Sequence, residues 1–177
     1  ANLRRGILIG ATIRRGRLSG ADLTRGRLNG INLTDADCEG VCMAEADIEF
    51  AIMANSDFRN ANFRDADMSG AILDAANLSG ADLRRANLRG ASFQDTRLYA
   101  ADLREARMGR AILKRTSLKE VDLRGAYLRV AKFHRTDISG ADLRDVEGLT
   151  TAQIMHTIRD AHTRLPVDLI TEIEDGE

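Results

Sequence analysis

The stretch "SGADLRRANLRGASF" (residues 79–93) decides the fold, because a small residue and a large apolar residue each return every five positions. Ala81, Ala86 and Ala91 form one series, and Leu83, Leu88 and Phe93 form the other. Five residues of an α-helix turn through about 500°, so neither series would form a stripe on a helix. A strand alternates with period two, so the apolar set would change faces at every unit. The period excludes one long helix and one long strand.

The same period runs in register from residue 1 to residue 145, which makes 29 consecutive units. The third position of a unit is Leu in 17 of the 29 and is never polar, and the first position is Ala in 19. We expect the chain to bend once per unit, with the first and third residues inward and the second and fourth outward. Successive coils would then pair as parallel strands about 4.8 Å apart. The spacing alone leaves three, four or five units per coil open.

Several units share the pattern A(D/N)LXX, in which X is any residue. They include ADLTR (21–25), ANFRD (61–65), ANLSG (76–80), ADLRR (81–85), ANLRG (86–90) and ADLRE (101–105). This pattern resembles the pentapeptide repeat family. The resemblance covers residues 1–145 and implies an all-β fold, a right-handed quadrilateral parallel β-helix with four units per coil, which we expect to form a domain over residues 1–146. On that pitch we expect about seven coils and a rod about 35 Å long.

The pattern stops after Val146, so residues 147–177 form a second region. Thr150 and Gln153 have the spacing of a capping box, and the apolar spacing predicts a helix over about 151–162 that ends before Pro166. We expect this region to be a helical cap that covers the last coil. Some members of the family pair through their C-terminal segments, so a homodimer through an end of the rod is a compatible alternative. The candidate contacts for the cap or the dimer are Ile154, Met155 and Ile158.

With four units per coil, residues 20 apart would stack on one side of the rod. One side then carries parallel columns of opposite charge, which are a candidate strip for binding an anion or a protein partner. The alternative is that the two columns neutralise each other, each exposed pair being worth at most about 1 kcal/mol. The columns comprise Arg64, Arg84, Arg104, Arg124 and Arg144, and Asp82, Asp102, Asp122 and Asp142.

A second side presents Ile52 and Ile72 outward in one column. Exposed apolar residues that stack form a patch, which makes this pair a candidate partner surface. β-Branched residues also suit strands for local reasons, so the column by itself does not require a partner.

The formal net charge is −1, but the charge is banded along the chain. Residues 1–34 sum to +6, residues 35–75 to −8, residues 76–135 to +8 and residues 136–177 to −7. Such bands could fix the register of a complementary partner, or they could reflect drift on a tolerant surface. The overall balance predicts no direct binding of nucleic acid.

The sequence lacks the arrangements that catalysis or cofactor binding requires. Cys38 lies at an inward position and Cys42 at an outward one, so they make a poor metal pair. No phosphate-binding or nucleophile motif is present, and a filled axis leaves no cavity for a substrate. We therefore expect no enzymatic activity, no cofactor and no metal. The absence of a long apolar run or a leader predicts a cytoplasmic protein without a membrane partner.

The function predicted from these features is that of a non-enzymatic protein-binding or scaffold module, a rigid rod that presents patterned polar faces to an unidentified protein partner. The family also includes fluoroquinolone-resistance proteins that mimic DNA and engage gyrase, so a gyrase inhibitor or protector is the alternative. Mimicry of DNA requires dense negative charge, whereas this chain is nearly neutral and carries arginine on every side.

Overall fold

The computed structural model describes residues 1–174, and side chains up to residue 171. The backbone bends at nearly every fifth residue, where φ is positive; Arg5 and Gly10, for example, have φ of 57° and 65°. The amide that follows each bend donates to the carbonyl three residues before it, as Ala11 N does to Leu8 O at 3.0 Å. The bend is thus a tight turn that needs a left-handed residue.

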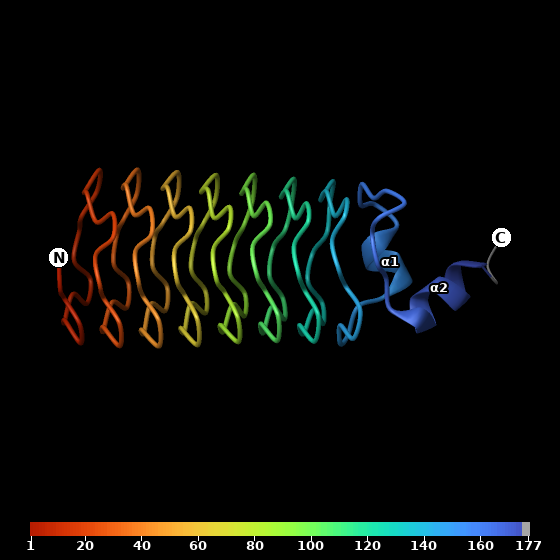
Figure 1. Cartoon of the computed structure of the whole chain (residues 1–177), viewed down its shortest axis with the longest axis horizontal. Helices are drawn as coiled ribbons and strands as arrows, with labels where there is room; N and C mark the ends of the chain where they lie inside the picture. The colour runs from red at the N-terminus through yellow and green to blue at the C-terminus, as the bar shows by residue number, and fades with distance from the viewer. Residues whose placement is uncertain (175–177) are drawn as a thin grey trace.

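Each second-position residue forms a parallel β-bridge with the residue 20 positions later, as Asn2 does with Asp22 and Ile7 with Arg27. Backbone hydrogen bonds link these positions, for instance Leu23 N to Cys42 O at 2.7 Å. Four units therefore make one coil, and the coils stack along the long axis of the molecule (Figure 1). Within residues 1–174 each side contributes a single bridge residue per coil, so no continuous strand forms.

The four sides are named here by their outward second-position columns. Side I carries Asn2, Asp22, Cys42, Asn62, Asp82, Asp102, Asp122 and Asp142. Side II carries Ile7, Arg27, Asp47, Asp67, Asn87, Arg107, Tyr127 and Glu147. Side III carries Thr12, Asn32, Ile52, Ile72, Ser92, Ile112 and Lys132. Side IV carries Arg17, Asp37, Asp57, Asn77, Arg97, Ser117 and Asp137.

The core is a column of third-position side chains on the axis of the rod, lined by small first-position residues. Leu83 and Leu103 are both 0% exposed, and the rings of Phe58 and Phe63 meet edge to face at 5.3 Å. First-position hydroxyl groups inside the wall are satisfied by carbonyls of the neighbouring coil, as Thr96 Oγ1 donates to Leu73 O at 2.8 Å. In the first coil the interior is more open, and Leu3 is 38% exposed.

The C-terminal region differs from the expected single helix. Helix α1 (Thr151–Ile154) begins with the predicted capping box, in which Thr150 and Gln153 bond to each other's backbone amides. The prediction of a helix as far as residue 162 is wrong, because the chain returns to β-pairing, with Ile158 bridged to Asp137. Backbone pairing with the preceding coil replaces further helical turns.

Pro166 precedes a second helix instead of ending the only one. Helix α2 (Val167–Glu174) starts directly after it, and Pro166 O accepts hydrogen bonds from the amides of Leu169 and Ile170 at 3.2 Å. Proline is tolerated at a helix start because the first amides have no partner within the helix. Figure 1 shows α1 against the last coil and α2 beyond it.

Candidate partner-binding surfaces

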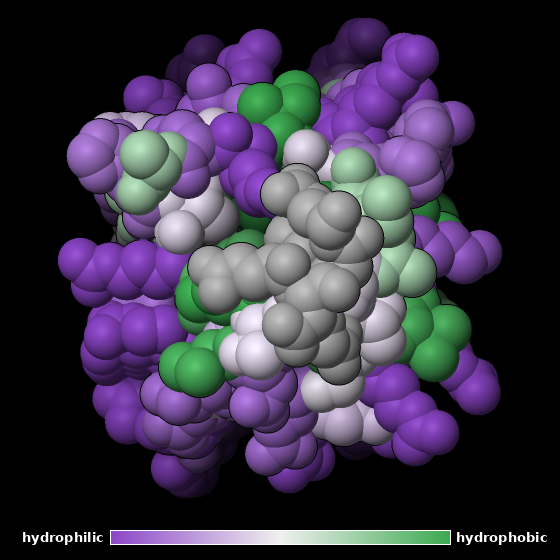
Figure 2. Space-filling view, turned by 90° about the vertical axis from the view of Figure 1, so that its right-hand side faces the viewer, coloured by the Kyte–Doolittle hydropathy of each residue, from purple (hydrophilic) through white to green (hydrophobic). Residues whose placement is uncertain are grey.

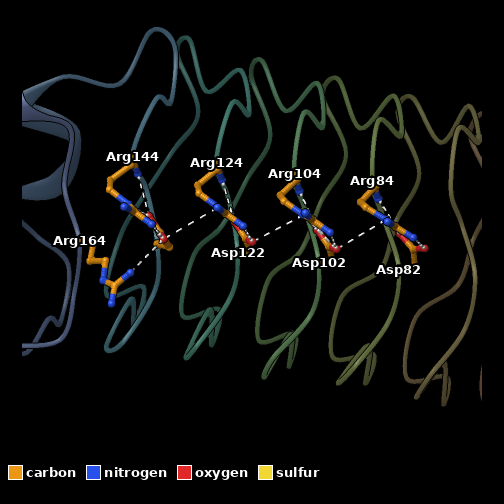
Figure 3. A network of polar contacts seen from close by, with 9 residues as sticks. Asp82, Arg84, Asp102, Arg104, Asp122, Arg124, Arg144 and Arg164 are labelled. Carbon is orange, nitrogen blue, oxygen red and sulfur yellow. Dashed lines mark hydrogen bonds and ion pairs between the residues drawn. The ribbon is translucent and has the colours of Figure 1, made fainter.

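The charged columns of side I form a continuous chain of ion pairs along the rod (Figure 3). Arg124 donates from Nη2 to Asp122 Oδ2 at 2.6 Å and from Nε to Asp122 Oδ1 at 2.9 Å. Its Nε also lies 3.9 Å from Asp142 Oδ2 on the next coil. The Arg124 hydrogen bonds hold the pKa of Asp122 below its ordinary value. The same arrangement repeats at Arg84 with Asp82, Arg104 with Asp102, and Arg144 with Asp142.

This network favours mutual neutralisation over an open charged strip. Each of those arginines uses its guanidinium on the aspartate two residues before it, and the coil-to-coil contacts join the pairs into a chain. Arg64 differs, because Asn62 stands where the other coils have aspartate, and its Nε lies 3.5 Å from Asp65 instead. Little unpaired charge remains on side I for a partner.

Side III carries an exposed apolar patch, defined here as Phe50, Ile52 and Ile72, which are 68%, 39% and 40% exposed. Phe50 occupies the corner between sides II and III with φ of 55°. Its ring lies over Gly70 of the next coil, where an added Cβ would come within 2.6 Å of it. Sequence reasoning found the two isoleucines but missed Phe50. Phe50 could have been singled out from the sequence, since it is the only aromatic residue at the fifth position of a unit.

Side II carries charges of both signs that form no ion pairs in the described chain; its carboxylates accept hydrogen bonds from neutral groups instead, as Asp47 does from Asn29 and Asp67 from Asn87. The ion pairs of residues 1–171 lie on sides I, III and IV and at the corners next to them. The outward charges of side II are Arg27, Asp47, Glu49, Asp67, Arg89, Arg107, Arg129 and Glu147. Sequence reasoning missed this side, because the position of a charge within the five-residue repeat does not show whether it forms an ion pair.

A hollow of about 320 Å³ lies on side II, lined by Arg89, Gly109, Arg110, Tyr127, Arg129 and Val130. Gly109 is not among the residues with positive φ, so its backbone does not require glycine. An added Cβ there would approach the Tyr127 ring to 3.2 Å, which explains the glycine as space for that ring. The hollow is therefore bounded by a tyrosine and arginine side chains without ion-pair partners in the described chain.

The three predicted contacts of the C-terminal region differ in exposure. Ile154 is 0% exposed, whereas Met155 and Ile158 are 70% and 56% exposed. Gln153 Nε2 donates to Leu128 O at 3.0 Å and to Ala131 O at 2.9 Å. Figure 2 looks onto this end, where apolar residues lie scattered among polar ones. Ile154 thus belongs to the interior, and only the other two could contact a partner.

Neither cysteine lies in a cluster that could bind a metal ion within the described residues. Burial, together with Asp37 and Asp57, raises the pKa of the Cys38 thiol to about 12, so the thiol stays protonated near neutral pH. Cys42 Sγ lies 3.2 Å from Thr24 Oγ1 on the surface of side I. Residues 1–174 contain no group of three side chains placed to hold a metal ion. None of their helices has the length and apolarity needed to cross a bilayer.

The family model described as "Pentapeptide repeats" matches residues 17–49, 42–80, 71–110 and 111–146. No curated protein matches the chain by sequence. Among solved structures, HetL, a pentapeptide repeat protein involved in heterocyst differentiation regulation in the cyanobacterium Nostoc, shares 26% identity over 92% of this chain and 78% of its own, with a TM-score of 0.43. A trypsin-treated form of QnrB1, a plasmid-mediated fluoroquinolone resistance protein, shares 17% identity over 93% of this chain and 95% of its own, with a TM-score of 0.50. The likeness to QnrB1 supports the fold alone.

Proposed function

Because this chain belongs to the pentapeptide repeat family, known for its right-handed β-helix, we propose that it is a non-enzymatic protein-binding module, a rigid rod that presents one side to a protein partner. The observation that carries the proposal is the apolar patch of Phe50, Ile52 and Ile72 on side III. Exposed apolar residues that stack over successive coils are typical of protein contacts, whereas scattered ones are ordinary.

The conformation of Phe50 supports a role for its ring. A non-glycine residue in the left-handed region costs about 1–2 kcal/mol, and glycine fills the same corner in the coils before and after it, at Gly30 and Gly70. The ring covers Gly70 and lies next to the isoleucine column, yet it stays 68% exposed. A large aromatic side chain held rigidly on a surface contributes contact area at low entropic cost when a partner binds.

The architecture suits this role because the rod is stiff. Third-position side chains such as Leu83 fill the axis, and every coil is hydrogen-bonded to the next. A surface of this kind keeps its shape on binding, so little ordering free energy is lost. We also propose that residues 147–177 cap the last coil, through Gln153 and the buried Ile154. The end of that region, residues 175–177, lies outside the described residues.

The test is site-specific photo-crosslinking in the source organism. A photo-reactive residue in place of Ile52 should capture a protein that the same residue in place of Arg97, on side IV, does not capture. Ile72→Asp in the Ile52-labelled chain should abolish the capture, because it places a charge in the apolar contact. Equal capture from both sides, or capture that survives Ile72→Asp, would contradict side III as the partner surface.

A gyrase supercoiling assay addresses the alternative function. The banded charge is mixed on every side, and side I is neutralised by its own ion pairs, which is unlike the uniform charge of a DNA backbone. We expect no inhibition and no protection from a fluoroquinolone at micromolar protein. Inhibition or protection would replace the protein-binding proposal with the gyrase function.

A further inference from the structure

We propose that side II binds a second copy of this chain, with the two rods antiparallel and related by a two-fold axis. This surface adjoins the patch on side III and shares only the corner residue Phe50 with it, and it differs from pairing through an end of the rod. The proposal rests on the order along side II of charges that lack ion-pair partners in the described chain, and on the hollow beside Tyr127.

Along side II the charges are segregated by sign. Arg27 is followed by an acidic stretch of Asp47, Glu49 and Asp67. A basic stretch of Arg89, Arg107 and Arg129 comes next, and Glu147 ends the series. On side I opposite charges alternate within every coil from Asp82 onward and neutralise each other, whereas the outward charges of side II form no ion pair among the described residues.

The order of charges along side II is complementary to itself when a second copy runs in the opposite direction. Asp67 and Arg107 lie one coil on either side of Asn87. Asp47 and Tyr127 lie two coils on either side of it, and Arg27 and Glu147 lie three coils on either side. Glu49 and Arg129 are likewise placed two coils from Arg89, in the neighbouring fourth-position column. Every charge of these two columns except Arg89 and Asp47 therefore has an opposite charge at the mirrored position. Asp47 has a phenol there, and Arg110 in the adjoining corner column has Gly70.

A two-fold axis that lies in the contact plane, perpendicular to the rods, produces this reversal. It turns the second rod end for end and keeps each column opposite the same column. Glu49 then meets Arg129 of the other copy, Asp67 meets Arg107, and Arg27 meets Glu147. Because the contact is isologous, each pair occurs twice. Charges matched in this way give both orientation and register.

The shape of the surface agrees with this register. In this register the hollow beside Tyr127 of one copy lies opposite the acidic stretch of the other copy. The Asp47 carboxylate of that copy can then accept a hydrogen bond from the Tyr127 hydroxyl. In the adjoining corner column, Phe50 comes opposite Val130, and these are 68% and 59% exposed. Val130 is the only β-branched residue with positive φ among the described residues, with φ of 61°. A strained apolar corner is the kind of feature that clusters at binding sites.

Other registers of the same two faces bring fewer opposite charges together. A shift of one coil in one direction places Asp47 opposite Glu147, which are both negative. The opposite shift leaves Asp47 opposite Arg107 as the only matched pair of charges. In the proposed register the only like pair is Arg89 against its own copy at the axis. The charge pattern thus selects one alignment of the two rods.

The contact covers six coil spacings, about 29 Å along the rod, and only one side of it. Such an area is at the small end of specific interfaces, so the dimer should be weak and should depend on ionic strength. Reversing one charge creates two like pairs in the dimer by symmetry. We expect at least about a tenfold rise in Kd for each such variant.

The experiment is sedimentation equilibrium of the full chain at low ionic strength, over concentrations up to about 1 mM. The wild type should dimerise, and about 0.5 M salt should dissociate it. Glu49→Arg and Arg129→Glu should each weaken the dimer, and the chain that carries both should recover it, because the swap restores opposite charges. Arg89→Gln should strengthen the dimer by removing the like pair. Arg97→Glu on side IV is the matched control and should leave it unchanged.

Circular dichroism of each variant confirms that the coils remain folded. A wild type that stays monomeric at low ionic strength overturns the proposal. So does a dimer that survives either single reversal, which would point to an end of the rod, or one that the double swap does not restore. None of these outcomes affects the crosslinking test on side III, so the two proposals fail separately.

Discussion

Arg124 donates two hydrogen bonds to the carboxylate of Asp122, two residues before it on the same side of the coil. The contact is local, so it forms whenever the unit adopts its turn, and its repetition in neighbouring coils lines side I with pairs. Repeated local pairing of this kind removes the repulsion that a column of stacked aspartates would otherwise produce. It stabilises the rod without offering charge to a partner.

The pH dependence of stability should change when this pair is removed. The Arg124 hydrogen bonds lower the pKa of Asp122 from its ordinary value of 3.8 in the folded chain. A group whose pKa is lowered by folding stabilises the fold above the unfolded value and loses that contribution as the pH falls through the folded value. Arg124→Gln should therefore lower the Tm at about pH 6, and the difference should shrink as the pH falls from about 4 to about 2. Arg97→Gln, which breaks no ion pair in the described chain, should show no such convergence.

Removing a core leucine should be costly because the axis is narrow and fully packed. Leu103 is 0% exposed, and Leu103→Ala should lower the free energy of unfolding by about 2–5 kcal/mol through lost burial and a cavity. Leu3→Ala is the matched change in the open first coil, where the side chain is 38% exposed, and should cost clearly less. Urea denaturation measures both. Equal losses at the two positions would contradict the assigned core.

The corner at Val130 should tolerate a residue that suits the left-handed region better. Val130 has φ of 61°, and asparagine adopts this conformation with less strain than a β-branched residue. Val130→Asn should raise the free energy of unfolding by about 1 kcal/mol. Gly90→Val in the same corner column, where φ is 67°, should lower it by a similar amount. A stabilising effect of Gly90→Val would show that the corner is not strained.

Gln153 should matter more than its exposed neighbours in the C-terminal region. Its side chain accepts a hydrogen bond from the Thr150 amide at 2.8 Å and donates to the carbonyls of Leu128 and Ala131. Gln153→Ala should cost about 1–2 kcal/mol, because it removes a cap and leaves two carbonyls of the last coil with fewer partners. Met155→Ala, at a position 70% exposed, should change the stability by less than about 0.5 kcal/mol. Thermal unfolding of both variants provides the comparison.

Much of the fold could be predicted from the five-residue period. The third positions predicted to lie inward, such as Leu83 and Leu123, are 0% exposed, and the capping box of Thr150 and Gln153 forms. These features depend on local bends and on neighbouring residues. The length of α1 could not be predicted, because it ends where Ile158 pairs with a coil some 20 residues earlier, and helical periodicity contains no information about that pairing.

The candidate surfaces were also predictable only in part from the sequence. Ile52 and Ile72 were identified because they recur at one position of the unit, and the structure adds Phe50 beside them. The charged residues of side I were also identified, but only the contacts show that Arg124 is committed to Asp122 while Arg129 on side II is not committed to any acid in the described chain. Which charges remain unpaired depends on distances between side chains, and those distances exist only after the coils have stacked.

The sequence by itself determined where the chain bends and which side chains enter the core, because a five-residue period permits the apolar set to face inward only if each unit turns. It left open how many units close one coil. The tertiary structure decided that number through backbone pairing, as in the bridge from Asn2 to Asp22, and so decided which residues share a side. The physical reason is that bending is a local property of each unit, whereas the register between coils is set by hydrogen bonds between residues far apart in the chain.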